Sequence, residues 1–583
     1  MSADEVHYCR GVRSIRGLLP ITKWLPQYDR GHLRHDVIAG VTVSALVVPK
    51  ALGYAGIASV PLEAGLYAAA AGAIFYALFG TSRQISTGPS SALAAVAGSA
   101  VALSGLGGDE APELVAAIAI AAGLLFLVMA VFKLGWISRF LSKAVITGFL
   151  AGAAVEVVIG EIPKITGTTS EGNNSWQKLA DWLRDFDGAH NLTLLVGLAA
   201  LAAILILRFT VPKLPGALVL VVGGLIASVA FDLDEHGVAT VGDVPRGVPT
   251  PALPGWGLIT DHAPTIGTAA VALVLIGFSQ TAGDARLFAA RHAYRIDVDQ
   301  ESVAQGMANV GAGVFQGMPV STSLSASSLN DAAGARTQMA SAVTGAAVVL
   351  TLLAFAPLFS DLPKAVLAAL IIDAVVFGMI DIPELRRLWS IKRFDFWIAA
   401  AAIFAVLGAG VLAGVMIGMV LSIGWLIYVT VTPETPELGR RPGTTAFRSL
   451  GQFPDGETHP GMLIMRFDGS LFFATADPLE DRLREAAIDA GGELTSVIID
   501  FAGVDFIDSQ GAAKMTEVFT LANSAGISSR LARVKPPVFE VLQADGYVDL
   551  LGRDRFHANI DGAVAAELES RAAAGAASSD TTD

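Results

Sequence analysis

The chain has 583 residues, of which 53% are hydrophobic and only 16% are charged. This apolar share is too high for a soluble protein of that length, so most of the chain is expected to lie in lipid. The formal net charge of −14 identifies no ligand, because a bound ion meets a local site rather than the sum over the whole chain. Cys9 is the single cysteine, which excludes an internal disulfide.

Uncharged apolar runs recur from Val37 to about Val431. A helix that crosses the hydrocarbon needs about 20 residues, and on this basis we expect roughly fourteen spans. The last run, 396–433, is long enough for two short spans that turn near Gly408 and Gly410. The sequence therefore predicts an α-helical, polytopic membrane protein.

Lys and Arg residues precede the first expected span and then fill every second loop. The loops between them are short or acidic, such as the loop over 232–262. Because positively charged loops stay on the cytoplasmic side, we predict a multi-pass protein of the cell (inner) membrane with both termini in the cytoplasm.

Changes in composition divide the chain into five parts. After the transmembrane region the sequence becomes polar, and alternating strand and helix patterns then indicate a small α/β domain. The last residues are small and polar, which is typical of disorder. The predicted parts are a cytoplasmic N-terminal segment 1–35, a transmembrane domain 36–432, a linker 433–460, an α/β domain 461–568 and a disordered tail 569–583.

The membrane region contains an internal repeat. The pentapeptide "LSKAV" at 141–145 opens one expected span from the cytoplasmic side, and "LPKAV" at 362–366 opens another from the outside. Proline-led segments rich in small residues, 86–98 and 317–334, also occupy matching places. Opposite sidedness of similar segments predicts two seven-span halves that are inverted relative to each other.

The two proline-led segments are too short and too polar for ordinary spans. A half-helix that begins inside the membrane presents unsatisfied N–H groups and about half a positive charge, so two facing N-termini can hold an anion. Serine and threonine hydroxyls at 90, 91 and 321–323 could complete the shell. The alternative is that these small residues only let helices pack closely.

Several stretches carry a resemblance to the SulP inorganic anion transporters. They include "DVIAGVTVSALVVPKALGYAGIASVPLEAGLYA" and "SLSASSLNDAAGARTQ", while "IDFAGVDFIDSQGAAKM" near the C-terminus resembles the signature loop of a STAS domain. The resemblance implies fourteen spans in two inverted repeats, a core domain that moves against a gate domain, and a homodimer. It also implies an anion site between the third and tenth spans, here near Gly88 and Val320.

The sequence departs from this family's pattern at the expected site. Lys50 follows Pro49 where many members have Gln, and Ala326 stands where many have Arg. Gln280 aligns with the usual carboxylate of the eighth span, while Asp284 follows one helical turn later. We interpret Lys50 as the replacement cation and Asp284 as the replacement acid that couples transport. The predicted anion-binding residues are Lys50, Ser90, Ser91, Ala92, Gln280, Ser321, Thr322 and Ser323.

Alternatives remain for the charged residues. Lys50 and Asp284 could form an ion pair that only joins helices, or Asp284 could lie at the cytoplasmic mouth. Glu156 and Asp373 are further intramembrane carboxylates that nothing in the sequence places at the site. In the STAS-like domain, Ser509 is either a phosphorylatable regulatory residue or a helix N-cap.

The predicted function is secondary active transport of a small inorganic anion, sulfate or bicarbonate, driven by H⁺ or Na⁺ through elevator-like alternating access. No nucleotide loop, metal cluster or nucleophile–base pair appears, so we predict no enzyme activity, no cofactor apart from the coupling ion, and no nucleic-acid partner. The alternatives are an uncoupled exchanger or channel, a dicarboxylate or nucleobase transporter, and an anion-sensing signalling protein.

Overall fold

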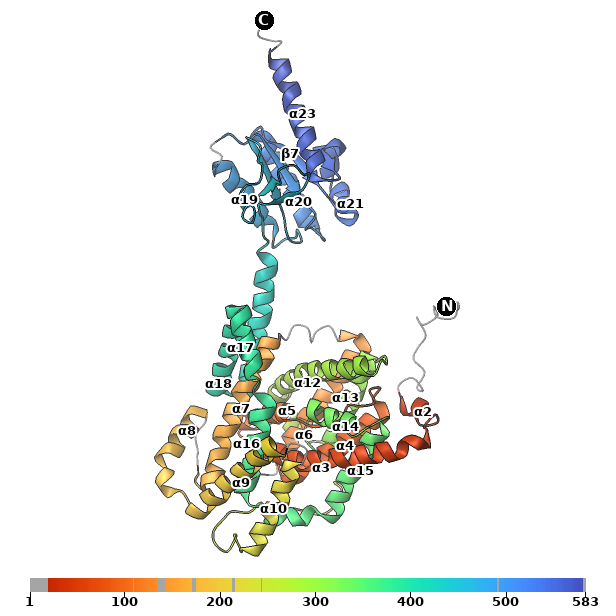
Figure 1. The fold of residues 1–583 in the computed structure, drawn as a ribbon, viewed down its shortest axis with the longest axis vertical. Coiled ribbons are helices and arrows are strands. Elements are labelled where there is room, and N and C mark those ends of the chain that lie inside the picture. Colours follow the sequence, from red (N-terminus) through yellow and green to blue (C-terminus); the bar gives the residue numbers. More distant parts are fainter. Residues whose placement is uncertain are drawn as a thin grey trace. The chain divides into compact units, whose positions relative to one another are not determined.

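The computed structural model describes residues 19–108, 110–134, 142–169, 175–211, 215–242, 244–489 and 492–579. Cys9, the first part of the predicted segment 1–35 and the last four residues of the tail lie outside these ranges. The chain separates into two compact units, Met1–Ile423 and Gly424–Asp583. Figure 1 shows the ribbon of both units, which are described one at a time below.

The first unit is a bundle of apolar helices that fall into two successive sets. The first set is α3 (Leu33–Ile57), α4 (Leu62–Phe79), α5 (Ser91–Ser104), α6 (Glu110–Phe132), α7 (Lys143–Thr166), α9 (Asn191–Thr210) and α10 (Gly216–Ala230). The second is α12 (Ala263–Arg291), α13 (Val298–Val314), α14 (Leu324–Ala332), α15 (Met339–Ala354), α16 (Lys364–Met379) and α18 (Arg393–Val431). Shorter helices α2 (Ile21–Trp24), α8 (Ser175–Arg184), α11 (Trp256–Asp261) and α17 (Ile382–Ile391) connect or flank them.

Helix α18 contains the predicted turn. Gly410 has φ 87° and ψ 165°, values outside the helical region that glycine tolerates because it has no Cβ. The turn divides α18 into two short spans, so each set contains seven helices among the described residues. Eight described helices are long and apolar enough to cross a membrane on their own. The expected architecture of about fourteen spans is confirmed.

The two sets run in opposite directions. Lys143 at the start of α7 forms an ion pair of 3.2 Å with Glu384, which follows the end of α16. At the other end, the Lys364 amide at the start of α16 donates to the Ala239 carbonyl at 2.9 Å. Gly237, two residues before Ala239, lies close to the His190 side chain, and the His190 amide donates to the carbonyl of Thr166, the last residue of α7, at 3.0 Å. Helices α7 and α16 are therefore antiparallel, as the inverted repeat requires.

The helices pack into two groups that correspond to a core and a gate. In the core, α13 packs against α6 and α4, α15 packs against α3 and α4, and α12 packs against α5 and α6. In the gate, α16 packs against α7, α9 and α10. The half-helices α5 and α14 lie within the first unit, surrounded by longer helices (Figure 1).

The second unit contains a four-stranded parallel sheet in the order β5-β6-β7-β8. The strands are β5 (Met462–Arg466), β6 (Ser496–Asp500), β7 (Ser528–Ala532) and β8 (Phe556–His557). Helices α19 (Ala476–Asp489), α20 (Ser509–Ser524), α21 (Pro536–Ala544) and α22 (Tyr547–Leu551) connect them. Phe467, Phe501 and Tyr547 are fully buried in its core. The predicted α/β domain is confirmed.

The predicted linker over 433–460 is wrong, because this segment belongs to the second unit. It forms an antiparallel hairpin of β3 (Leu438–Arg440) and β4 (Phe447–Ser449). Glu437 pairs with Met465 on β5, which attaches the hairpin to the sheet. Leu438 is buried against Ile464 and Ile498, and this apolar contact is what a solvated linker would lack.

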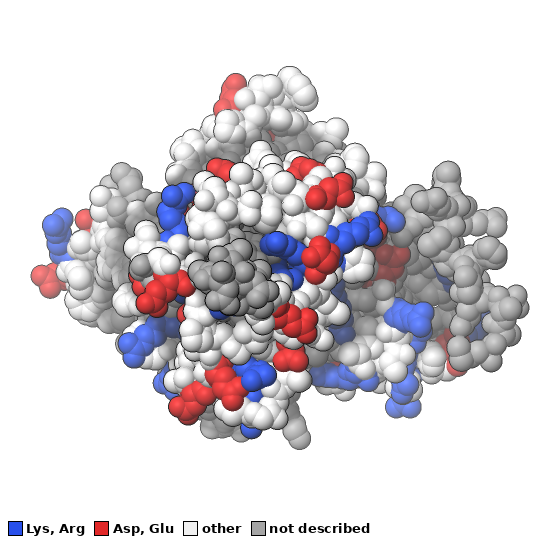
Figure 2. Space-filling model, turned by 90° about the horizontal axis from the view of Figure 1, so that it is seen from above, with Lys and Arg blue, Asp and Glu red and all other residues white. Residues whose placement is uncertain are grey.

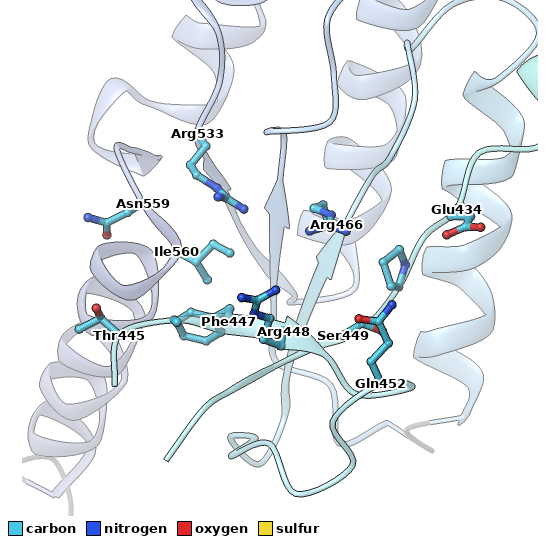
Figure 3. A pocket seen from close by; sticks show the side chains of 12 residues that line it. Glu434, Thr445, Phe447, Arg448, Ser449, Gln452, Arg466, Arg533, Asn559 and Ile560 are labelled. Carbon is cyan, nitrogen blue, oxygen red and sulfur yellow. The ribbon is translucent and has the colours of Figure 1, made fainter. Parts of the chain in front are cut away.

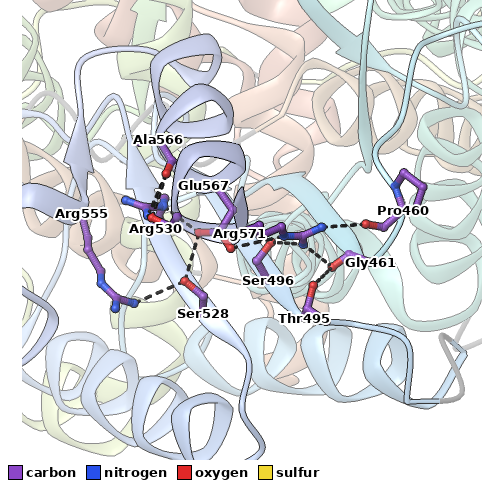
Figure 4. Close-up of polar contacts among 11 residues, drawn as sticks. Pro460, Gly461, Thr495, Ser496, Ser528, Arg530, Arg555, Ala566, Glu567 and Arg571 are labelled. Carbon is purple, nitrogen blue, oxygen red and sulfur yellow. Dashed lines mark hydrogen bonds and ion pairs between the residues drawn. The ribbon is translucent and has the colours of Figure 1, made fainter. Parts of the chain in front are cut away.

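The predicted disordered tail is also wrong as far as residue 579. Helix α23 (Ile560–Ser579) continues through it, since alanine-rich sequence favours a helix. Figure 4 shows the contacts that hold α23. Glu567 pairs with Arg530 of β7 at 2.8 Å, and both side chains are buried. Arg571 donates to the carbonyls of Pro460 and Gly461 at 2.8 and 2.9 Å.

The acidic excess of the chain is not gathered on the face that Figure 2 displays. Acidic and basic side chains lie interspersed there among uncharged ones. The net charge therefore gives no guide to a ligand, and the site must be sought in local geometry.

Candidate functional site

Two short strands bring the proline-led segments together. Strand β1 (Thr87–Pro89) pairs antiparallel with β2 (Val320–Thr322), and Gly88 lies opposite Ser321. Helix α5 begins two residues after β1, and α14 begins two residues after β2. The pairing therefore places the starts of the two half-helices next to each other, where the inverted repeat predicted them.

Buried amides on α13 hold this strand pair. Asn309 donates to the Val320 carbonyl at 2.8 Å and accepts from the Val320 amide at 3.0 Å, as a neighbouring strand would. Gln305 donates to the Thr87 hydroxyl at 3.0 Å. Asn309 and Gln305 are each at most 1% exposed. Because buried hydrogen bonds are costly to leave unmade, these contacts fix the register of the pair.

The first residues of both half-helices are capped by serine. Ser90 accepts from the Leu93 amide and Ser323 accepts from the Ala326 amide, each at 3.4 Å. These long bonds satisfy one amide per helix. The remaining first-turn amides, which include that of Ala92, have no acceptor within the helix. Two groups of N–H donors are thus available at adjacent helix starts, each with the positive end of a helix dipole.

Lys50 supplies a cation at the same place. Its Nζ donates to the Ser325 hydroxyl in the first turn of α14 at 3.1 Å. Ser325 also contacts Ser323 at 3.2 Å. Helix α3 therefore carries a positive charge to the start of α14.

Helix α12 presents Gln280 and Asp284 to the same strand. Gln280 Oε1 accepts from the Ser321 hydroxyl at 3.1 Å, and Asp284 Oδ2 accepts from the Thr322 hydroxyl at 3.2 Å. The two residues lie on one face of α12, one turn apart, as their spacing predicted. The structure thus brings together Lys50, Ser90, Ser91, Ala92, Gln280, Asp284, Ser321, Thr322 and Ser323 around the starts of α5 and α14.

The alternative in which Lys50 pairs with Asp284 is not seen. Among the described residues these two side chains form no ion pair or hydrogen bond with each other; Lys50 contacts Ser325 and Asp284 contacts Thr322. In the described part of the chain, each of these two side chains therefore makes one hydrogen bond, to a hydroxyl. That leaves both groups available to a ligand or a coupling ion.

The other two intramembrane carboxylates lie elsewhere. Asp373 on α16 accepts two hydrogen bonds from Arg208 on α9, at 2.7 and 2.6 Å. The Arg208 guanidinium also lies 4.3 Å from the centre of the Phe377 ring. Glu156 on α7 has a buried carboxylate oxygen without a hydrogen-bond partner in the described part of the chain. Among the described residues, neither side chain forms a hydrogen bond or an ion pair with β1, β2 or Asp284.

Sequence reasoning missed Tyr54. This side chain is 7% exposed and lies on α3, the helix that carries Lys50. Tyr54 follows Lys50 by four residues on α3, so both lie on one face of the helix. That spacing was the signal that could have identified it.

In the second unit, Ser509 is not the N-cap of α20. Asp508 occupies that position, and its Oδ1 accepts from the Gly511 amide at 2.7 Å. Ser509 is the first residue of the helix and is exposed. The carboxylate of Asp508 is therefore the side chain that caps the first turn of α20.

The fold and the site define a class: a multi-pass membrane protein of two inverted seven-helix repeats, with two half-helices meeting at their N-termini, followed by a STAS domain. The model of the sulfate permease family matches residues 33–402, and the STAS domain model matches residues 454–563. The chain belongs to the sulfate permease family.

Relatives match over nearly the whole chain. A probable sulfate transporter of Mycobacterium tuberculosis is 32% identical over 93% of this chain and 96% of its own length. High affinity sulfate transporter 2 of Stylosanthes hamata is 30% identical over 95% of this chain and 87% of its own. Murine Slc26a9, an anion transporter solved in the inward-facing state, has the same fold, with a TM-score of 0.86 at 20% identity over 96% of both chains.

Proposed function

We propose that this protein is a secondary active transporter of a small inorganic anion, and that it prefers sulfate. The observation that carries the proposal is the β1–β2 pairing, which sets two helix starts side by side with Lys50 at one of them. Such a site binds an anion through amides, hydroxyls and one cation. The names of the two relatives support sulfate over the dicarboxylate and nucleobase alternatives.

For the mechanism, we propose an elevator-like movement of the core against the gate. The anion would bind between α5 and α14, which belong to the core, and travel with it past α7 and α16. Asp284 would take up H⁺ or Na⁺ as the anion arrives, so that the loaded core carries less net charge. We further propose a homodimer in the cell membrane with both termini in the cytoplasm.

The test is counterflow of radiolabelled sulfate and bicarbonate in proteoliposomes, with and without imposed H⁺ and Na⁺ gradients. We expect saturable sulfate uptake that one gradient drives uphill. Uptake equally fast with either anion and insensitive to both gradients would indicate an uncoupled exchanger. Currents too large for a moving carrier would indicate a channel, and binding without any flux would indicate an anion sensor.

A further inference from the structure

A cavity of about 430 Å³ lies within the second unit, where the hairpin β3–β4 meets the sheet. Its lining combines three arginines, Arg448, Arg466 and Arg533, with polar groups such as Ser449 and Gln452. Figure 3 shows these three arginine side chains around one space, with Phe447 and Ile560 beside it. Glu434 is the one acidic residue of the lining and lies on the side of Arg466, away from Arg533 and Asn559 (Figure 3). Such a concentration of guanidinium groups is suited to an anion.

Two of the arginines are held in fixed orientations. Arg533 donates through Nε at 2.8 Å and through Nη2 to the carboxylate of Asp500, which is fully buried. The hydrogen bonds to Asp500 raise the pKa of Arg533. Arg466 donates through Nε to Asp468 Oδ2 at 2.8 Å, and its Nη2 forms an ion pair with the same oxygen at 2.6 Å. Since a guanidinium has five N–H donors, each arginine retains donors for a further acceptor.

The backbone at Arg533 is unusual as well. Its φ of 58° lies in the left-handed region, which side chains other than Gly, Asn and Asp seldom adopt. The Arg533 amide donates to the His557 carbonyl at 2.9 Å, and this bond holds the conformation. Strained residues of this kind occur preferentially at ligand sites. Here the strained residue presents its guanidinium to the cavity.

Arg448, the third arginine, differs from the other two. It is exposed and has no carboxylate partner in the described part of the chain. Helix α23, which has 20 residues, begins at Ile560 in the cavity lining and adds the positive end of its dipole. Two preoriented guanidiniums, one unpaired guanidinium and a helix start thus surround the space.

We propose that this cavity binds a tetrahedral oxyanion, either a phosphate ester or free sulfate, with Arg448 closing on an anion already held by Arg466 and Arg533. Phosphate and sulfate oxygens accept the parallel N–H pairs that arginine offers. The apolar surfaces of Phe447 and Ile560 leave room for a small organic group on the ester. The site does not depend on the proposed transport function, because none of its residues belongs to the membrane unit.

The experiment is equilibrium binding of inorganic phosphate, pyrophosphate and sulfate to the purified full-length protein, by titration calorimetry. Arg448→Gln is the test variant, and Arg441→Gln is the matched control, since Arg441 is exposed on the same hairpin but outside the cavity lining. Thermal unfolding without ligand checks that both variants fold. We expect Arg448→Gln to weaken binding of at least one probe about ten- to hundredfold, with Arg441→Gln unchanged.

The three probes of this experiment distinguish a phosphate ester from free sulfate as the ligand of the cavity. Binding of phosphate or pyrophosphate that depends on Arg448 identifies a phosphate ester, whereas such dependence for sulfate alone identifies sulfate. Sulfate bound at the membrane site is unaffected by Arg448→Gln and cancels in the comparison. The proposal is overturned if no probe shows a dependence on Arg448, or if Arg441→Gln weakens binding equally.

Discussion

Two regions of the membrane unit each contain a buried or half-buried aspartate, but they satisfy it differently. At α12 and β2, Asp284 accepts one hydrogen bond from the neutral Thr322 hydroxyl. At α9 and α16, Asp373 accepts two parallel hydrogen bonds from one edge of the Arg208 guanidinium, through Nε and Nη2. A carboxylate that is already paired with a guanidinium gains little from binding a coupling ion. A carboxylate that is hydrogen-bonded only to a hydroxyl still has an uncompensated charge, which a proton or Na⁺ can neutralise. From this difference we propose Asp284 as the coupling residue and expect a structural role for Asp373.

Asp284→Asn provides the strongest test of this comparison. Removing the titratable carboxylate should abolish uphill accumulation, so that the anion distributes equally across the membrane, while anion-for-anion exchange continues. The measurement is sulfate uptake against an imposed pH or Na⁺ gradient, with exchange measured in the same vesicles. Accumulation that survives in Asp284→Asn would move the coupling role elsewhere, first to Glu156, one of whose carboxylate oxygens has no hydrogen-bond partner among the described residues.

Asp373→Asn should act on stability rather than on coupling. Breaking a buried ion pair costs about 3–5 kcal/mol, but Arg208 is 39% exposed, so we expect about 1–3 kcal/mol. Thermal unfolding in detergent measures this, with the exposed Asp361→Asn as the control. Replacing both Asp373 and Arg208 with Leu should recover much of the loss. A stable Asp373→Asn protein that fails to accumulate anion would reverse the two roles.

Lys50 lies on α3, which packs against both α14 and α16. Its Nζ donates to the Ser325 hydroxyl at the start of α14. We expect Lys50→Gln to weaken sulfate binding about tenfold, because a charge-assisted bond to the anion is lost, and Lys50→Arg to weaken it less. Equilibrium binding of labelled sulfate compares the three proteins. Equal affinity in all of them would show that Lys50 serves only to join α3 to α14.

Ending the chain at Thr432 should have the smallest effect on substrate choice. The membrane repeats contain all the residues proposed to bind the anion, so the shortened protein should transport more slowly but keep its preference between sulfate and bicarbonate. Counterflow of both labelled anions in parallel measures this. A reversed preference would mean that the second unit takes part in selecting the anion.

Much of the site could be predicted because its signals are local. A proline followed by small hydroxyl residues marked both half-helices, and the four-residue spacing placed Gln280 and Asp284 on one face of α12. The turn at Gly410 followed from the length of one apolar run. Each of these inferences needed only a short window of sequence.

The parts that could not be predicted depend on distant partners. Asp373 and Arg208 are 165 residues apart, so nothing local indicated that they pair. Asn309 was passed over because its partner is the backbone of β2 rather than a side chain. The tail was misread from its small residues, since the anchor that keeps α23 on the sheet is the distant contact between Glu567 and Arg530.

The most direct test of the account is sulfate binding by Ser323→Leu beside its matched variant Ser328→Leu. Ser323 caps α14 at the meeting point of the half-helices, whereas Ser328 is exposed on the same helix. Loss of the cap costs about 1 kcal/mol, so thermal unfolding is recorded for both variants. We predict that Ser323→Leu weakens binding about tenfold or more while Ser328→Leu leaves it unchanged. Unchanged affinity in a folded Ser323→Leu protein, and likewise in Ser91→Leu, would contradict an anion site between α5 and α14.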